Sequence, residues 1–298
     1  MIAGIGDDCS VVRIPAGHDM LVTTDFSLEG VHFRREWHPP ESVGHRCLAR
    51  GLSDIAAMGG EPEAAFLSLA LPAKLPQAWM DRFLRGLLKL GKEFGVTLAG
   101  GDTSQSPHGI LADIVVVGSV PNGEAVLRDG ARPGDRIYVT GTLGGSAAAL
   151  ELLTRKKALN TRLHETHFFP TPRIEVGKIL RKKKMASAMI DLSDGLSTDL
   201  LHICEESGVG AEVLEEAIPK ATFGNAAREV NTDFALHGGE DYELLFTAPR
   251  GVRVPRSLAG VPISEVGFVR RDQRRLLRVG DGARELSPRG WEYFRRTS

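Results

Sequence analysis

Hydrophobic and polar positions along the chain predict strands that alternate with helices. Apolar residues spaced three and four positions apart predict helices over residues 41–58, 76–94, 146–153, 173–184 and 196–207. Short runs of apolar and β-branched residues predict strands over residues 20–24, 64–71, 96–99, 110–120, 136–140, 188–192 and 242–247. The clearest helix, 76–94, is expected to bury one face made of Met80, Phe83, Leu84, Leu87 and Leu88. This alternation is typical of an α/β (α+β) protein.

A turn-rich stretch divides this pattern into two halves. Residues 121–135 contain pairs such as Asn122-Gly123 and Pro133-Gly134, which interrupt regular structure. The chain has 298 residues, which is long enough for two medium-sized domains. We therefore expect one domain over residues 1–122 and a second over residues 123–298.

Charge and cysteine content narrow the class of protein. The net charge is −1, which argues against a protein that binds nucleic-acid phosphates through a basic surface. Cys9, Cys47 and Cys204 lie far apart, so neither a disulfide framework nor a zinc site is indicated. The chain shows no signal-peptide pattern, and its apolar runs are too short to span a bilayer. A cytoplasmic protein that binds neither nucleic acid nor membrane is expected.

Acidic residues recur beside glycine or hydroxyl residues, after apolar strand-like runs. Small neighbours let a ligand approach the backbone, and strand ends are where ligands bind in α/β folds. One such aspartate is more often a turn residue or a helix cap, as Asp194 could be for the helix that starts at Leu196. The chain, which has no marked net acidity, contains six such segments: Gly6-Asp7-Asp8, Thr23-Thr24-Asp25, Ser53-Asp54, Gly100-Gly101-Asp102-Thr103, Asp191-Leu192-Ser193-Asp194-Gly195 and Gly239-Glu240-Asp241.

If these carboxylates converge, cations or protons must offset their repulsion. Two carboxylates ~4 Å apart repel by about 4 kcal/mol at an effective dielectric constant near 20. Oxygen ligands without histidine or cysteine favour a hard cation such as Mg²⁺ or Mn²⁺, which commonly binds carboxylates together with substrate phosphates. The sequence therefore indicates nucleotide chemistry, although it has no G-x-x-x-x-G-K-[ST] motif. The glycine-rich run 141–145, which opens a helix, is a weak signal for anion binding.

Taken in order, these segments resemble the motifs of the thiamine-monophosphate kinase family. The resemblance runs from residue 4 to the C-terminus, and its EGVHF and GGEDYEL segments are similar to the kinase branch of a superfamily that includes aminoimidazole ribonucleotide synthetase and selenophosphate synthetase. Family members usually carry a further, mostly helical segment before the first motif, so we expect either a shortened form or a start at an alternative methionine, with an effect on the stability of the dimer edge but not on the implied ligands. The matching segments are GIGDDCS (4–10), TTDFSLEGVHF (23–33), LSDIAAMGG (52–60), AGGDT (99–103), IDLSDGLSTDL (190–200) and GGEDYELLF (238–246).

The resemblance implies a fold, a reaction and a set of site residues. The fold is the two-domain synthetase-superfamily fold, with an N-terminal mixed sheet that pairs across a homodimer and a C-terminal α/β layer domain. The reaction is phosphorylation of thiamine monophosphate to thiamine diphosphate by ATP, assisted by several Mg²⁺ ions and without a general base. The implied Mg²⁺ ligands are Asp8, Thr23, Thr24, Asp25, Asp54, Asp102, Asp191 and Asp194. The implied ATP contacts are Gly101, Asp102, Arg128 and Ser193, and the implied substrate contacts are His32, Glu240 and Trp291.

Other interpretations stay open on the sequence alone. Arg128 is equally well explained as a surface residue of a turn. Without the resemblance, a plain hydrogen-bonded histidine is favoured for His32, and core packing is the commoner case for a lone tryptophan such as Trp291. Two other functions also stay open. One is a different ATP-dependent synthetase of the same superfamily, and the other is a nucleotide-binding homologue without catalytic activity.

Overall fold

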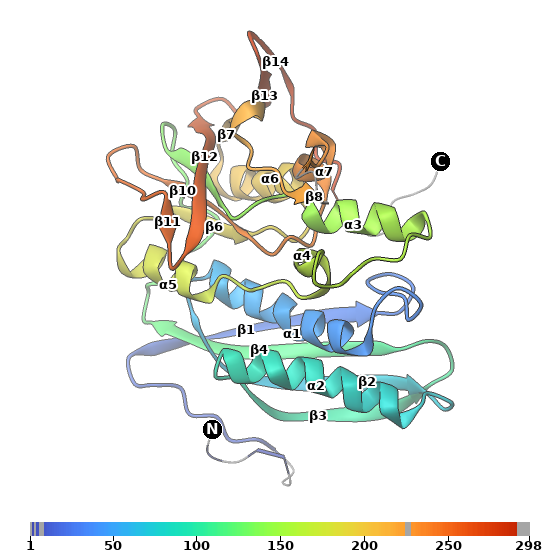
Figure 1. Ribbon diagram of the computed structural model, residues 1–298. Helices are drawn as coiled ribbons and strands as arrows, with labels where there is room; N and C mark the ends of the chain where they lie inside the picture. Colours follow the sequence, from blue (N-terminus) through green and yellow to red (C-terminus); the bar gives the residue numbers. More distant parts are fainter. Residues whose placement is uncertain (1, 3, 6–8, 224–227, 291–298) are drawn as a thin grey trace. The chain divides into compact units, whose positions relative to one another are not determined.

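The computed structural model describes residues 2, 4–5, 9–223 and 228–290, and it contains two compact units (Figure 1). Both units are discontinuous along the chain, and the predicted division at residues 122 and 123 stays a prediction. The N-terminal unit comprises Met1–Ile55, Gly60–Ala125 and Phe168–Ile174, and the C-terminal unit comprises Ala56–Gly59, Val126–His167 and Glu175–Ser298.

The N-terminal unit is a mixed four-stranded sheet with two long helices on one face. The strand order is β1-β4-β2-β3, with antiparallel pairing except between β2 and β3. Helices α1 and α2 lie on the same side of this sheet (Figure 1). The strands are β1 (His18–Leu28), β2 (Glu61–Pro72), β3 (Thr97–Ser106) and β4 (Leu111–Pro121), and the helices are α1 (Pro40–Ala57) and α2 (Gln77–Glu93).

Helices α1 and α2 cross closely because each has a glycine at the contact. A Cβ atom added at Gly44 would lie 1.9 Å from the carbonyl oxygen of Phe83, and one added at Gly86 would lie 1.9 Å from that of Glu41. Helix α2 buries Met80, Phe83 and Leu87, as predicted, whereas Leu84 is only partly buried. Leu88 is 49% exposed, so its assignment to the buried face was wrong, because it lies a further 100° around the helix from Leu87.

The crossing of α1 and α2 predicts a strong effect of a single methyl group. Gly86→Ala should lower the free energy of unfolding by about 1–3 kcal/mol, because the backbone of α1 leaves no room for the added atom. Urea unfolding of the variant and the wild type measures this difference. Gly251→Ala is the control, since an added Cβ there meets nothing within 4 Å. Equal destabilisation by both substitutions would contradict the close crossing.

Strands β1 and β3 extend beyond the aspartates that were expected to end them. Asp25 lies within β1, where it is in register with Ile114 of β4, and Asp102 lies within β3. Asp54 is on helix α1 rather than after a strand. The expectation that these residues mark strand ends was therefore wrong. Pairing with neighbouring strands continues through them, because strand pairing uses backbone groups and not side chains.

The C-terminal unit is built on a second, larger sheet. Its strand order is β14-β13-β7-β12-β5-β10-β6, and the short β11 pairs with β12. The strands are β5 (Arg136–Thr140), β6 (Ala188–Asp191), β7 (Gly210–Leu214), β10 (Leu244–Ala248), β11 (Ser257–Leu258), β12 (Val261–Arg270), β13 (Arg275–Val279) and β14 (Gly282–Glu285), with β8 (Thr222–Phe223) and β9 (Arg228–Glu229) as a separate pair. The helices of this half are α3 (Gly145–Thr154), α4 (Glu165–Phe168), α5 (Ile174–Lys182), α6 (Leu196–Ser207), α7 (Thr232–His237) and the 3-10 turn η1 (Glu215–Ala217).

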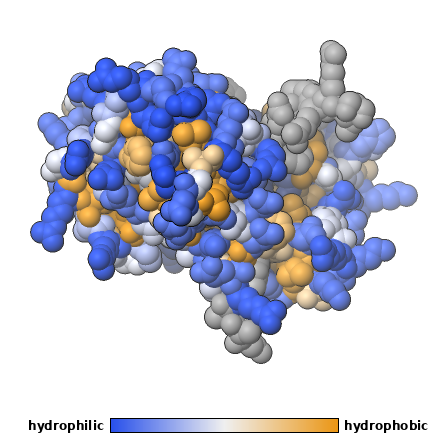
Figure 2. Space-filling view, turned by 90° about the horizontal axis from the view of Figure 1, so that it is seen from above, coloured by the Kyte–Doolittle hydropathy of each residue, from blue (hydrophilic) through white to orange (hydrophobic). Residues whose placement is uncertain are grey.

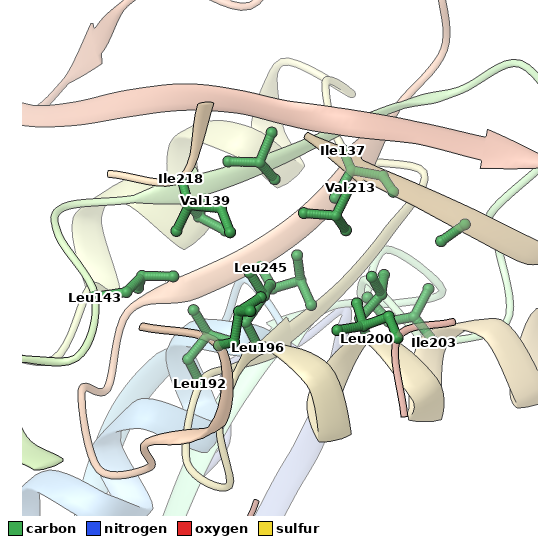
Figure 3. Close-up of a cluster of buried hydrophobic side chains, with 14 of the residues drawn as sticks. Ile137, Val139, Leu143, Leu192, Leu196, Leu200, Ile203, Val213, Ile218 and Leu245 are labelled. Carbon is green, nitrogen blue, oxygen red and sulfur yellow. The ribbon is translucent and has the colours of Figure 1, made fainter. Parts of the chain in front are cut away.

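The core of the C-terminal unit lies between its sheet and helix α6. Leu196, Leu200 and Ile203 of α6 are buried at helical spacing and point toward the strand residues Val139 and Leu245 (Figure 3). Helix α6 ends at Gly208, which has a φ of +66° and caps the helix as predicted. Burial of its apolar face fixes the position of α6 on the sheet. At the surface, on the face shown in Figure 2, hydrophilic and hydrophobic residues are interspersed.

All predicted helices and strands are present, and the predicted mixed α/β class is confirmed. In the described part of the chain, no helix combines the length and apolar character that a membrane span requires.

Candidate functional site

The N-terminal unit brings three predicted metal ligands together between strand β1 and helix α1. Thr23 and Asp25 alternate on β1 and face the helices, and Asp54 projects from α1. The Thr23 hydroxyl donates a hydrogen bond to Oδ2 of Asp54, and the carboxyl groups of Asp25 and Asp54 share a hydrogen bond. We call Thr23, Asp25 and Asp54 the β1–α1 cluster.

The electrostatics of the β1–α1 cluster suit a bound cation. Burial, followed by the charge of Asp54, raises the pKa of Asp25 to about 7, although Arg50 opposes this shift. Arg50 also donates from Nη1 to the carbonyl oxygen of Phe26 at 3.1 Å, which fixes its position beside the cluster. A hydrogen bond between two carboxyl groups requires a proton on one of them. The side chains of the cluster offer only oxygen atoms as metal ligands, and two of them share a proton. A set of this kind fits a hard divalent cation.

The raised pKa of Asp25 predicts how stability depends on pH. A carboxyl group whose pKa rises on folding stabilises the folded state at low pH, and this contribution is lost as the pH rises through about 7. Asp25→Asn should therefore gain about 1–3 kcal/mol of stability relative to the wild type at pH 8 without metal, and less at pH 5. Urea unfolding at both pH values tests this.

The same experiment with Mg²⁺ supplies a second readout. Mg²⁺ should stabilise the wild type at pH 8 and should have a smaller effect on Asp25→Asn, which lacks the charge that binds the cation. Glu93→Gln, at an exposed position on α2, is the control and should behave like the wild type. Identical pH and Mg²⁺ responses for wild type and Asp25→Asn would contradict the assignment.

Two other predicted residues of this unit lie on the opposite face of the sheet. The Thr24 hydroxyl donates to Oδ1 of Asp113 at 2.7 Å. Asp113 of β4 is in register with Ser68 of β2, which is itself in register with Asp102 of β3. The three side chains therefore form one row across the face of the sheet that α1 and α2 do not cover. The side chains of Thr24 and Asp102 are therefore not brought to the β1–α1 cluster within one chain. The sequence analysis did not identify Asp113 as the partner of Thr24, although a charged residue within an otherwise apolar strand was a signal of such a contact.

Gly101 and Asp102 lie on β3, an edge strand of the sheet, and both residues are exposed. A Cβ atom added at Gly101 would lie 1.9 Å from the carbonyl oxygen of Leu67, so only glycine fits there. Asp102 is exposed, and its Oδ1 accepts a hydrogen bond from the amide of Thr103 at 2.8 Å. Ser10 donates from Oγ to the Ala99 carbonyl oxygen at 2.5 Å, which places part of the first motif beside β3. Two predicted site residues lie outside the described residues, namely Asp8 and Trp291.

His32 follows β1 in a hydrogen-bonded turn. Its Nδ1 accepts a hydrogen bond from the amide of Leu28 at 2.9 Å, and its carbonyl oxygen accepts one from Nη2 of Arg46 at 3.3 Å. A neutral ring that accepts at Nδ1 carries its proton on Nε2. The turn therefore fixes both the orientation and the tautomer of this side chain.

In the C-terminal unit, the predicted residues Asp191, Ser193 and Asp194 share one turn between β6 and α6. We call residues 191–195 the β6–α6 turn. Asp191 is the buried last residue of β6, and Gly195 occupies the N-cap of α6 with a φ of +106°. Asp194 is therefore not the helix cap that the sequence left open as an alternative.

Two residues near this turn were missed from the sequence. A carboxylate oxygen of Asp194, one of Asp199 and a ring nitrogen of His202 lie within 4.8 Å of one another. Asp199 is fully buried on α6, and burial raises its pKa well above the usual range, with further contributions from Asp191 and Asp194. The sequence feature that could have indicated Asp199 is its position in the first turn of a helix that directly follows the acidic segment 191–195.

The loop of residues 238–243 holds Glu240 against the β6–α6 turn. The amide of Glu240 donates to the Ser193 carbonyl oxygen at 2.9 Å, and that of Tyr242 donates to the Leu192 carbonyl oxygen at 3.0 Å. Glu240 and Tyr242 have φ angles of +64° and +52°, which are unfavourable for residues with side chains. Strain of this kind persists where the surrounding structure enforces it, and it clusters at functional sites.

Asp241 closes the N-terminus of helix α3. Its carboxylate accepts hydrogen bonds from the amides of Gly144 at 2.6 Å and Ser146 at 3.2 Å. Burial raises the pKa of Asp241 to about 7, against the lowering effect of these two hydrogen bonds. The protein's own carboxylate thus takes the place of an external anion, so the weak anion-binding signal of residues 141–145 was wrong.

Arg128 lies in a turn of the same unit, with its side chain exposed. The Ser207 hydroxyl donates to the Arg128 carbonyl oxygen at 2.8 Å and accepts from the amide of Ala131 at 3.1 Å. The backbone of this arginine is therefore held while its guanidinium group faces solvent.

Comparison with known proteins decides the family. The model of the AIR synthase related protein, N-terminal domain, matches residues 6–120, and that of the C-terminal domain matches residues 132–255. A thiamine-monophosphate kinase of Salmonella typhimurium is 40% identical and covers 94% of this chain and 87% of its own length. The chain belongs to the thiamine-monophosphate kinase family. The family predicted from the sequence, and its class as a kinase, are thus confirmed.

Solved structures of thiamine-monophosphate kinases share the fold. The enzyme from Stenotrophomonas maltophilia K279a superposes with a TM-score of 0.82 at 36% identity, over 92% of this chain and 90% of its own. The structure of AaThiL complexed with AMPPCP and TMP has a TM-score of 0.82 at 35% identity, over 97% of this chain and 92% of its own. The two-domain fold predicted from the resemblance is therefore confirmed.

Proposed function

We propose that this protein transfers a phosphoryl group from ATP to thiamine monophosphate and forms thiamine diphosphate. Membership of the thiamine-monophosphate kinase family supports this reaction, as does the likeness to a structure that binds AMPPCP and TMP. The observation that carries the proposal is the meeting of Thr23, Asp25 and Asp54 between β1 and α1, because a set of oxygen ligands of this kind fits the Mg²⁺ that accompanies ATP.

The two acidic groups have the same chemical task. We propose that the β1–α1 cluster and the β6–α6 turn each hold Mg²⁺, with Asp8, Thr24 and Asp102 as further ligands. Bound Mg²⁺ would neutralise phosphate charge and so reduce the repulsion between two phosphorylated substrates. The acceptor is itself a phosphate that is largely ionised near neutral pH, so the protein needs no general base.

The remaining predicted residues would orient the two substrates. Gly101 admits a phosphate close to the backbone, and Ser193 and Arg128 supply a hydroxyl and a guanidinium group for ATP. Glu240, which the 238–243 loop holds in place, supplies a negative charge for the cationic thiazolium ring. The fixed Nε2–H of His32 supplies a hydrogen-bond donor, and Trp291 an aromatic surface for stacking.

We further propose that the uncovered face of the N-terminal sheet pairs with a second copy of the chain. Met20, Val22 and Phe26 alternate along β1 on this face and are 60%, 57% and 57% exposed. Contiguous exposed apolar side chains mark an interaction surface. A second copy would bury them, and it would also bring a second Asp102 to this face.

The decisive experiment incubates the purified protein with ATP, Mg²⁺ and thiamine monophosphate and measures thiamine diphosphate and ADP. Equal amounts of both products are expected. ADP with other acceptors but not with thiamine monophosphate would favour another synthetase of the superfamily. Mg-ATP binding without ADP from any acceptor would favour a non-catalytic homologue.

Asp102→Ala should leave the fold intact, since the side chain is exposed, but should lower turnover at least about 100-fold by removing a metal ligand. Calorimetry should show that Mg²⁺-dependent ATP binding is lost with it. Asp81→Ala, at an exposed acidic position on α2, is the matched control and should bind ATP normally. Unchanged nucleotide affinity in Asp102→Ala would defeat the assignment.

Val22→Asp should convert a dimer into monomers, because it places a charge in the centre of the proposed apolar interface. Light scattering after size-exclusion chromatography measures the mass of each variant. Leu88→Asp introduces the same charge at a residue on α2 that is 49% exposed, and it should leave the dimer unchanged. A monomeric wild type, or a dimeric Val22→Asp, would refute the proposed interface.

A further inference from the structure

Asp199 is a buried carboxylate next to the β6–α6 turn that none of the predicted roles explains. It is 1% exposed and lies in the first turn of α6. A single oxygen, Oδ2, accepts hydrogen bonds from the amides of Asp194 at 3.2 Å and Gly195 at 2.9 Å. Buried charged groups are unfavourable unless other interactions offset them, so a buried aspartate needs an explanation.

The main chain of the β6–α6 turn is held from two sides. The carbonyl oxygens of Leu192 and Ser193 accept hydrogen bonds from the 238–243 loop, and the amide of Leu192 donates to the Glu243 carbonyl oxygen at 2.8 Å. A Cβ atom added at Gly239 would lie 2.3 Å from the Ser193 carbonyl oxygen, so the two segments touch. The carbonyl side of the turn is thus fixed by the loop, and Asp199 fixes the amide side.

The side chains of Ser193 and Asp194 are the groups of this turn that the proposed function assigns to ATP and Mg²⁺. Gly195 has a φ of +106°, which glycine adopts readily and residues with a side chain rarely do. Fixing the amides on either side of the Asp194 Cα atom restricts the direction of its Cα–Cβ bond. Groups that orient a metal ligand in this way typically change metal affinity about 10- to 100-fold when they are removed.

We propose that Asp199 is a positioning residue: its Oδ2 atom fixes the backbone of Asp194 and Gly195 so that the Asp194 carboxylate and the Ser193 hydroxyl face the bound Mg-ATP. This proposal rests on the proposed function and assigns Asp199 a role through hydrogen bonding rather than through its charge. Asp199 also lies near His202 in a group that could hold a cation directly, and the test separates these two roles.

Asp199→Asn and Asp199→Ala distinguish positioning from direct ligation. One amide oxygen can accept both hydrogen bonds that Oδ2 accepts, so Asp199→Asn should keep kcat and the Mg²⁺ concentration for half-maximal activity within about threefold of wild type. Asp199→Ala should raise that Mg²⁺ concentration about tenfold or more. Loss of Mg²⁺ activation in Asp199→Asn, with an unchanged fold, would overturn the proposal in favour of a charged ligand.

A double-mutant cycle with Asp194→Ala tests whether Asp199 acts through Asp194. In the Asp194→Ala background, Asp199→Ala should change the Mg²⁺ requirement for ATP binding by less than about twofold, because the group that it positions is absent. Full additivity of the two effects would refute positioning. Calorimetry of Mg²⁺-dependent ATP binding is the readout, so the cycle does not need turnover by the single variant Asp194→Ala.

Two controls keep the outcomes separate. Glu206→Ala removes an exposed acid from the same helix and should match the wild type. If Asp199→Ala fails to fold by circular dichroism, the comparison of Asp199→Asn with wild type still decides between the two roles. Absence of kinase activity in the wild type would refute the proposed function, whereas a charge requirement in an active wild type would refute only this inference.

Discussion

Mutual repulsion of carboxylates is the constraint around which both units of this protein are arranged. Asp25 and Asp54 share a hydrogen bond between β1 and α1, and burial together with Asp54 raises the pKa of Asp25 to about 7. Asp199 is buried near two further aspartates, which raises its pKa as well. Neither arrangement favours folding without a cation or a proton. The surrounding structure must therefore supply the stability that these groups remove.

That stability comes from elements that leave the acidic groups little freedom. In the N-terminal unit, Gly44 and Gly86 let α1 and α2 approach closely, so the position of Asp54 on α1 is fixed by packing. In the C-terminal unit, the apolar face of α6 is buried against the sheet (Figure 3), and the 238–243 loop and Asp199 hold the turn that precedes the helix. Rigid elements of this kind keep like charges at a constant separation, which a cation-binding site requires.

The sequence predicted elements well where periodicity was long and the site less well where geometry depended on distant contacts. Eighteen-residue α1 and seventeen-residue α2 have several turns of pattern, whereas the six residues of α7 have too few. Strand β7 was missed because Glu212 interrupts its apolar run, and Arg270 and Arg278 donate to this buried carboxylate at 2.7 and 2.6 Å. Motifs identified the acidic residues, but no motif shows that Asp25 lies within a strand.

Strand alternation explains why adjacent predicted ligands differ in environment. Thr23 and Asp25 face α1, whereas Thr24 between them bonds to Asp113 on the uncovered face, beside the exposed side chains of β1. One strand can thus present ligand groups on one side and an apolar interaction surface on the other, because side chains alternate with a period of two. A shift of one residue in the pairing of β1 with β4 would exchange the two faces. The register of this pair is therefore a requirement for the β1–α1 cluster and for the proposed dimer at the same time.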